Sequence, residues 1–127
     1  MVRSFPVPVT TDGSGDATGY TPSCSGLVRA ISYVPHASTP LDTNADIVVT
    51  GNVSGIAILT KANIGLSAVT FHPRAAVVAT ADGAALLYST SNPVADLVPV
   101  SDEAIKIVVA NGAATKSGTF YVFVDGA

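Results

Sequence analysis

The stretch "EAIKIVVANGAATKSGTFYVFVDG", from Glu103 to Gly126, decides the fold. Two strand-like segments, "EAIKIVVAN" and "TFYVFVDG", are separated by "GAATKSG", whose small and polar residues are typical of a turn. The second segment has a period of two, in which Phe120, Val122 and Val124 alternate with Thr119, Tyr121, Phe123 and Asp125. Both faces of this strand carry large apolar groups. We therefore expect one face on the core and the other either on a neighbouring subunit or inside the same sandwich.

Working outward, the rest of the chain has the same character of short strands and turns. Strands are predicted at "SFPVPVTT", "GLVRAISYVP", "LSAVTFHP" and "VADLVPVSD", and a hairpin joins Ile47–Thr50 to Ile56–Lys61 through "GNVSG". The segment "AALLYST" leads to a turn at "SNP", and a polar loop is expected at "HASTPLDTNA". The segment "RAAVVATADG" is compatible with either a helical turn or a strand.

Two of these strands carry specific face predictions. In "SFPVPVTT", Val7 and Val9 share one face, and Pro6 and Pro8 share the other. Proline has no N–H, so this segment suits an edge strand or an extended arm over residues 1–10, and not a central strand. In "GLVRAISYVP" the two alternating sets are Leu27, Arg29, Ile31 and Tyr33, and Val28, Ala30, Ser32 and Val34.

Regularly spaced strands without an amphipathic helix predict an all-β fold. We expect one domain over residues 1–127, a jelly-roll-like β-sandwich of about eight short antiparallel strands. The order of the strands stays open, because it is not contained in the alternation pattern.

The composition predicts a surface suited to contact with a partner. Hydrophobic residues make up 48% of the chain and charged residues only 12%, about half the usual share. A weakly polar surface is better matched to a protein partner than to free solution. The net charge of −3 and the scattered Lys and Arg argue against a nucleic-acid partner, and the apolar runs are too short to span a bilayer.

Residues capable of catalysis or metal binding occur, but not in a productive pattern. His36 and His72 each stand next to a proline, without a motif that supplies a nucleophile. Asp12, Ser14 and Asp16 imitate the start of an EF-hand loop, yet Ser23 occupies the place of its bidentate Glu, so a hairpin turn is expected instead. We expect no enzyme activity, no metal site and no cofactor.

Cys24 and the tyrosines are predicted to be structural. Cys24 has no evident cationic neighbour and is expected to be a small, half-buried residue. Sugar binding on exposed aromatics remains an alternative, because the chain has Tyr20, Tyr33, Tyr88 and Tyr121 but no Trp. Tyr33 and Tyr121 are expected to pack within their strands.

The chain as a whole resembles small structural proteins of tailed bacteriophages and prophages. The similarity is carried by "RSFPVPVTTDGSGDATGYTP", "GLVRAISYV", "AILT", "HPRAA", "GAALLY" and "VADLVPVSDEAIKIVVANGAATKSGTFYVFVDG", which together cover nearly the full sequence. These are short phrases without invariant chemical residues. The resemblance implies a capsid decoration, or cement, protein that binds the outer surface of the head shell in the virion. The alternatives are a neck, tail or fibre-associated protein, or a glycan-binding β-module.

The resemblance also implies two partners, the major capsid protein and further copies of this chain as a dimer or trimer. On that hypothesis the candidate interface residues are Arg3, Phe5, Val7, Tyr121 and Phe123. Phe5 would anchor an N-terminal arm in a pocket, and Arg3 would pair with acidic groups of the capsid. An ordinary first edge strand is the alternative for the arm. Tyr121 and Phe123 would present the contact surface of the last strand.

Overall fold

The protein is all-β throughout the part of the chain that the structure describes. This computed structural model describes residues 1–76, 87–89, 92–93 and 95–126, and it describes side chains outside 76–95. The main strands are β1 (Val2–Thr10), β2 (Ala17–Tyr20), β3 (Cys24–Pro35), β4 (Asp46–Gly51), β5 (Ala57–Lys61), β6 (Val69–Phe71), β11 (Val98–Glu103), β12 (Ile105–Ala110) and β13 (Ser117–Asp125). Short strands β7 (Ala75–Ala76) and β10 (Ala95–Asp96) pair with each other, as do β8 (Leu87–Ser89) and β9 (Asn92–Pro93).

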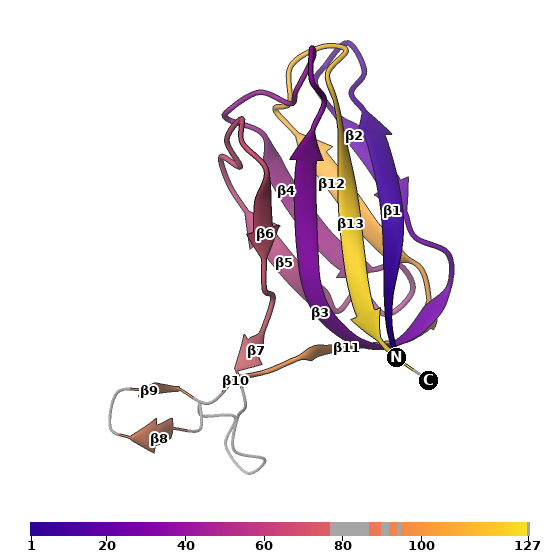
Figure 1. Ribbon diagram of the computed structural model, residues 1–127, viewed down its shortest axis with the longest axis vertical. Helices are drawn as coiled ribbons and strands as arrows, with labels where there is room; N and C mark the ends of the chain where they lie inside the picture. The colour runs from indigo at the N-terminus through magenta and orange to yellow at the C-terminus, as the bar shows by residue number, and fades with distance from the viewer. Residues whose placement is uncertain (77–86, 90–91, 94, 127) are drawn as a thin grey trace.

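The main strands form two antiparallel sheets that face each other (Figure 1). The front sheet has the order β1-β13-β3, followed on the far edge of β3 by β6 along one half and β11 along the other. The back sheet has the order β2-β12-β4-β5. Leaving β11 aside, this arrangement is that of an eight-stranded jelly roll, so the predicted jelly-roll-like sandwich is confirmed.

Strand β13 lies at the centre of the front sheet because both its neighbours pair along most of its length. β1 pairs with it from Val2↔Asp125 to Thr10↔Ser117, and β3 pairs on the other side. Phe120, Val122 and Val124 are buried, whereas Tyr121 and Phe123 are only half-buried. One face of β13 therefore looks into the sandwich and the other looks outward, which excludes burial of both faces within one sandwich.

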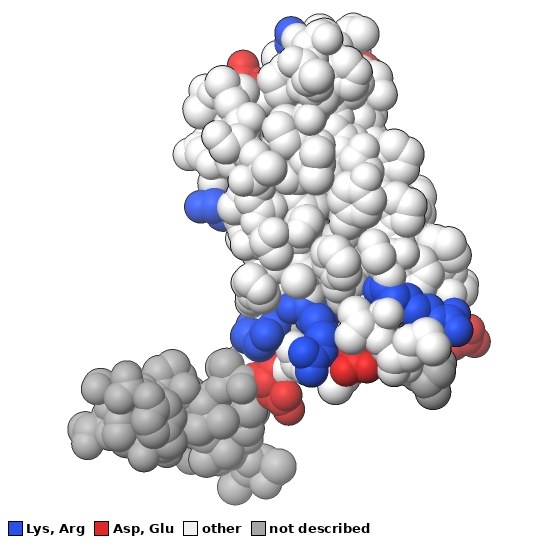
Figure 2. Space-filling view, in the orientation of Figure 1, with Lys and Arg blue, Asp and Glu red and all other residues white. Residues whose placement is uncertain are grey.

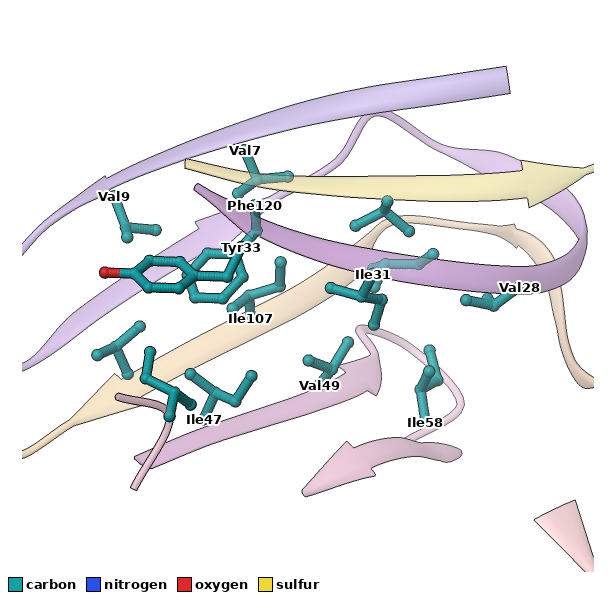
Figure 3. Packing of buried hydrophobic residues seen from close by; sticks show 14 of the residues in the cluster. Val7, Val9, Val28, Ile31, Tyr33, Ile47, Val49, Ile58, Ile107 and Phe120 are labelled. Carbon is teal, nitrogen blue, oxygen red and sulfur yellow. The ribbon is translucent and has the colours of Figure 1, made fainter. Parts of the chain in front are cut away.

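The core fills the space between the sheets with β-branched residues and one aromatic pair (Figure 3). The rings of Tyr33 and Phe120 lie 5.1 Å apart with 32° between their planes. The Tyr33 hydroxyl oxygen accepts a hydrogen bond from the Leu41 N–H at 3.3 Å. The expectation that Tyr33 is a packing residue is confirmed, since its side chain is fully buried.

A β-bulge at Arg29 corrects the predicted faces of β3. Phe123 pairs with Ala30 but the next residue of β13, Val124, pairs with Val28, so Arg29 is an extra residue. Val28 consequently lies in the core together with Ile31 and Tyr33. The predicted strict alternation, which placed Val28 and Ile31 on different faces of the strand, was wrong. The extra residue in the bulge reverses which face each residue before it occupies.

The structure confirms several of the other predicted elements and corrects others. The hairpin around "GNVSG" is present as β4 and β5, and the Asp12 turn forms because Asp12 Oδ1 accepts the N–H groups of Ser14 and Asp16. β2 was not predicted, and the "SNP" turn is wrong for Asn92–Pro93, which form β9. The loop predicted as polar buries Leu41 and Ala45.

One ambiguous segment stays largely open. Of "RAAVVATADG", only residues 74–76 are described, with Ala75–Ala76 in β7, and residues 77–83 lie outside the described part of the chain.

Candidate functional site

The outer face of the front sheet is a broad surface of apolar and hydroxyl side chains. Its central row crosses four strands in register, from Pro6 through Tyr121 and Ser32 to Thr70. Neighbouring rows place Pro8, Thr119 and Val34 on one side, and Ser4, Phe123 and Ala30 on the other. Val34 is 45% exposed, and Tyr121 and Phe123 are half-buried, so these apolar groups are accessible to a partner.

Charged groups lie at the margins of this face and not at its centre. Figure 2 shows a white middle region, with Lys and Arg gathered near the end that holds the N-terminus. None of the three residue rows contains a charged residue. Covering this surface would therefore desolvate few strongly hydrated groups, which lowers the free-energy cost of burial.

The open edge of β1 is poorly suited to pairing with another strand. Alternate residues of a strand direct their N–H and C=O groups to the same side. Thr11 N–H donates to the Lys116 carbonyl at 2.8 Å, so the backbone N–H and C=O groups of odd-numbered residues point toward β13. The backbone groups of even-numbered residues, Pro6 and Pro8 among them, point toward the open edge. That edge lacks N–H donors at both prolines, a common protection of edge strands. Residues 2–10 form an edge strand in this chain, and not a free arm.

A shallow groove hollows the face near the N-terminal end, and we call it the arginine groove. Its volume is about 410 Å³. It is lined by Val2, Arg29, Ala30, Ser32, Thr70, His72, Arg74 and Phe123. A second hollow, of about 430 Å³, lies at the opposite end of the same face and includes Pro8, Val34, His36 and Thr119.

Hydrogen bonds hold the two guanidinium groups of the arginine groove. Arg74 Nη1 donates to the Pro73 carbonyl at 2.7 Å and to the Arg29 carbonyl at 3.2 Å. The second bond satisfies a backbone carbonyl at the bulge, where the regular ladder is interrupted. Arg29 Nε donates to Asp125 Oδ2 at 3.2 Å, and both of these side chains are at least one-third exposed.

The predicted interface residues separate into two groups. Tyr121 and Phe123 lie together on the outer face, and Arg3 is exposed at the start of β1. Val7 is 1% exposed and belongs to the core, and Phe5, on the same face of β1, packs against that core. The prediction that Val7 contacts a partner was therefore wrong, because β1 turns this face inward. Phe5 is only half-buried, and its contact with a partner stays a prediction.

The two histidines and Cys24 lie in different surroundings. His36 Nδ1 accepts the backbone N–H groups of Ser38 and Thr39, which stabilises a loop, and His72 is exposed and lines the arginine groove. Cys24 is half-buried, as predicted. Burial, assisted by the charge of Glu103, raises the pKa of the Cys24 thiol and so disfavours the reactive thiolate.

The other tyrosines do not form a cluster with Tyr121. Tyr20 is 52% exposed on β2 of the back sheet, and Tyr33 is in the core. Tyr88 lies in β8, where the side chain is outside the described part. The three described tyrosines thus lie on the back sheet, in the core and on the outer face of the front sheet.

Sequence reasoning missed Glu103, which anchors the β4–β5 connection. Its Oε1 accepts hydrogen bonds from the N–H of Val53 at 2.9 Å, the N–H of Ser54 at 3.0 Å and the Ser54 hydroxyl at 3.2 Å. Glu103 is only 5% exposed, and these donors lower the pKa of its carboxyl group. A lone Glu at a strand end gives no sequence signal of such a long-range contact.

The described part of the chain contains neither a metal-binding cluster nor a membrane-spanning helix, and the chain matches no known protein. Within the described ranges, no group of three or more His, Cys, Asp or Glu side chains could hold a metal ion. No helix in the same ranges is long and apolar enough to cross a membrane. No family model, curated protein or solved structure matches this chain.

Proposed function

We propose that this chain is a structural virion protein of a tailed bacteriophage, most simply a capsid cement protein on the outside of the head shell. The observation that carries the proposal is the outer face of the front sheet, where Tyr121, Phe123 and Val34 are accessible and the central rows are uncharged. The resemblance of the sequence to phage structural proteins gives the class of partner. Self-association as a dimer or trimer forms part of the same proposal.

The physical role follows from binding equilibria. A protein that binds the assembled shell and not its dissociated subunits stabilises the shell by mass action. The requirement is a rigid domain with a face that can be covered at small desolvation cost. A jelly roll with a charge-poor outer sheet meets that requirement without catalytic groups.

Quantitative mass spectrometry of purified virions tests the proposal by counting copies of this chain relative to the major shell protein. A ratio near one, or a simple fraction of it, is expected for cement. A few copies per particle would move the protein to the neck, tail or fibre. Absence from the particle would overturn the structural role and favour a glycan-binding module.

A further inference from the structure

The arginine groove differs in chemistry from the rest of the outer face. Its lining combines the apolar residues Val2, Ala30 and Phe123 with the basic or polar residues Arg29, Arg74 and His72. A groove lined by both apolar and cationic groups can bind a segment that carries both an apolar side chain and a negative charge.

The local charge is opposite to that of the whole chain. The chain has nine acidic and six basic residues, yet two of the basic residues line this one groove. Asp125 pairs with Arg29 and offsets one positive charge. Asp96, opposite Ala75 in the short β7–β10 ladder, is exposed and does not line the groove. The lining groups therefore present an excess of positive charge.

Two hydrogen bonds orient the guanidinium group of Arg74. Its Nη1 is bonded to two backbone carbonyls, those of Pro73 and Arg29. A guanidinium has five N–H donors in a planar fork that matches a carboxylate. Because these bonds favour one orientation of the side chain, less rotational freedom is lost when a carboxylate binds.

We infer that the arginine groove binds an extended acidic segment of the shell protein, with an Asp or Glu side chain at Arg74 and Arg29 and a neighbouring apolar side chain on Val2 and Ala30. This inference rests on the proposed function and adds the chemistry of the partner. A sugar fits less well, because the Ser32 and Thr70 hydroxyls are bonded to each other at 2.8 Å and Val2, Ala30 and Phe123 of the lining are apolar.

Binding to assembled shells of the major capsid protein from the same phage tests the inference. Arg74→Glu reverses one charge of the groove, and Lys61→Glu makes the same change on exposed Lys61 of β5 in the back sheet. We expect Arg74→Glu to weaken binding at least about tenfold, and Lys61→Glu to leave it within about twofold. Thermal unfolding and circular dichroism of both variants, which must match the wild type, ensure that affinities of folded proteins are compared.

A photo-cross-linking amino acid at Thr70, an exposed residue that lines the groove, then identifies the occupant by mass spectrometry. The expected product contains a shell-protein peptide with an acidic residue next to an apolar one. Changing that acidic residue to Arg should restore binding of Arg74→Glu, because the charges are then exchanged. A cross-linked peptide without an acidic residue would overturn the inference.

The outcomes separate the inference from the proposed function. If the wild type binds shells and Arg74→Glu binds as well as Lys61→Glu, the groove is not the contact and only the inference fails. If the wild type does not bind shells, both fail. Retention on an immobilised acidic polysaccharide in that case would identify a glycan as the occupant.

Discussion

Tyr33 and Phe120 join the two central strands of the front sheet through a tilted ring pair, with their ring centroids 5.1 Å apart. The two residues are also cross-strand partners in the β3–β13 ladder. The Tyr33 hydroxyl additionally accepts the N–H of Leu41, which attaches the loop after β3 to the core. This pair therefore lies where β3 and β13 are paired, where the core is packed and where the loop after β3 is attached.

Removing one ring of this pair should destabilise the fold strongly. Phe120→Ala should lower the free energy of unfolding by about 3–5 kcal/mol, because it leaves a cavity and deletes the ring contact. Tyr33→Phe keeps the ring and should cost only about 1 kcal/mol through the lost hydrogen bond. Urea denaturation of both variants measures their free energies of unfolding. Equal losses of stability would show that the ring contact is not the main contribution of this pair.

Gly118 should not tolerate a side chain. A Cβ at this position would lie 2.5 Å from Tyr33 Cε1, so Gly118→Ala should displace the Tyr33 ring and cost about 1–3 kcal/mol. Gly13 provides a matched control, since a Cβ there meets nothing within 4 Å. Gly13→Ala should change stability by less than about 0.5 kcal/mol. Similar unfolding midpoints for the two variants would contradict the close packing at Gly118.

Alternation and turn residues together predicted the last two strands and the β4–β5 hairpin. A period of two is visible in β13, whereas β12 and the two strands of the hairpin stand next to turn residues. β2 was missed because "ATGY" is short and contains Gly19, which a tight contact requires: a Cβ there would lie 2.5 Å from Val7 Cγ1. Such a contact joins distant parts of the chain and is not encoded in the local pattern.

The site was less predictable than the fold for the same reason. The separation of Val7 from Pro6 and Pro8 onto opposite faces was visible, but which face turns inward depends on the sheet packed behind it. The bulge at Arg29, which brings Arg29 and Arg74 to one groove, has no glycine or proline signal. Tyr121 and Phe123 were identified because an apolar set on the second face of a core strand is visible in the sequence.

Acid should destabilise the protein partly through Glu103. Backbone N–H groups of Ser54 and Val53 favour its carboxylate, so its folded pKa lies below the ordinary value of 4.5. A lowered folded pKa means that the stabilisation is complete above pH 4.5 and is lost as the pH falls through the folded value. Glu103→Gln keeps an acceptor oxygen but does not titrate, so its unfolding free energy should fall less steeply below pH 4.5.

Amide exchange provides a local readout of the same effect. The Val53 and Ser54 N–H groups should lose protection as Glu103 becomes protonated, after correction for the pH dependence of intrinsic exchange. Asp12, whose pKa is also lowered by backbone N–H donors from Asp16 and Ser14, should produce a separate loss at its own turn. Parallel stability curves for wild type and Glu103→Gln would show that Glu103 does not contribute.

Phe123 and Phe120 distinguish a contact surface from the core on a single strand. Phe123→Asp should leave a folded protein that no longer self-associates, because this half-buried ring lies on the outer face. Phe120→Asp should unfold the chain, because it places a charge in the core without a partner. Tyr20→Asp, on the exposed back sheet, should leave both folding and association unchanged.

Sedimentation velocity and circular dichroism on the three variants separate the outcomes of this last test. A monomeric wild type would contradict the proposed self-association. An unfolded Phe123→Asp would show that the outer ring contributes to the core after all. Loss of association in Tyr20→Asp but not in Phe123→Asp would move the contact to the back sheet, because the two substitutions add the same charge to opposite faces of one sandwich.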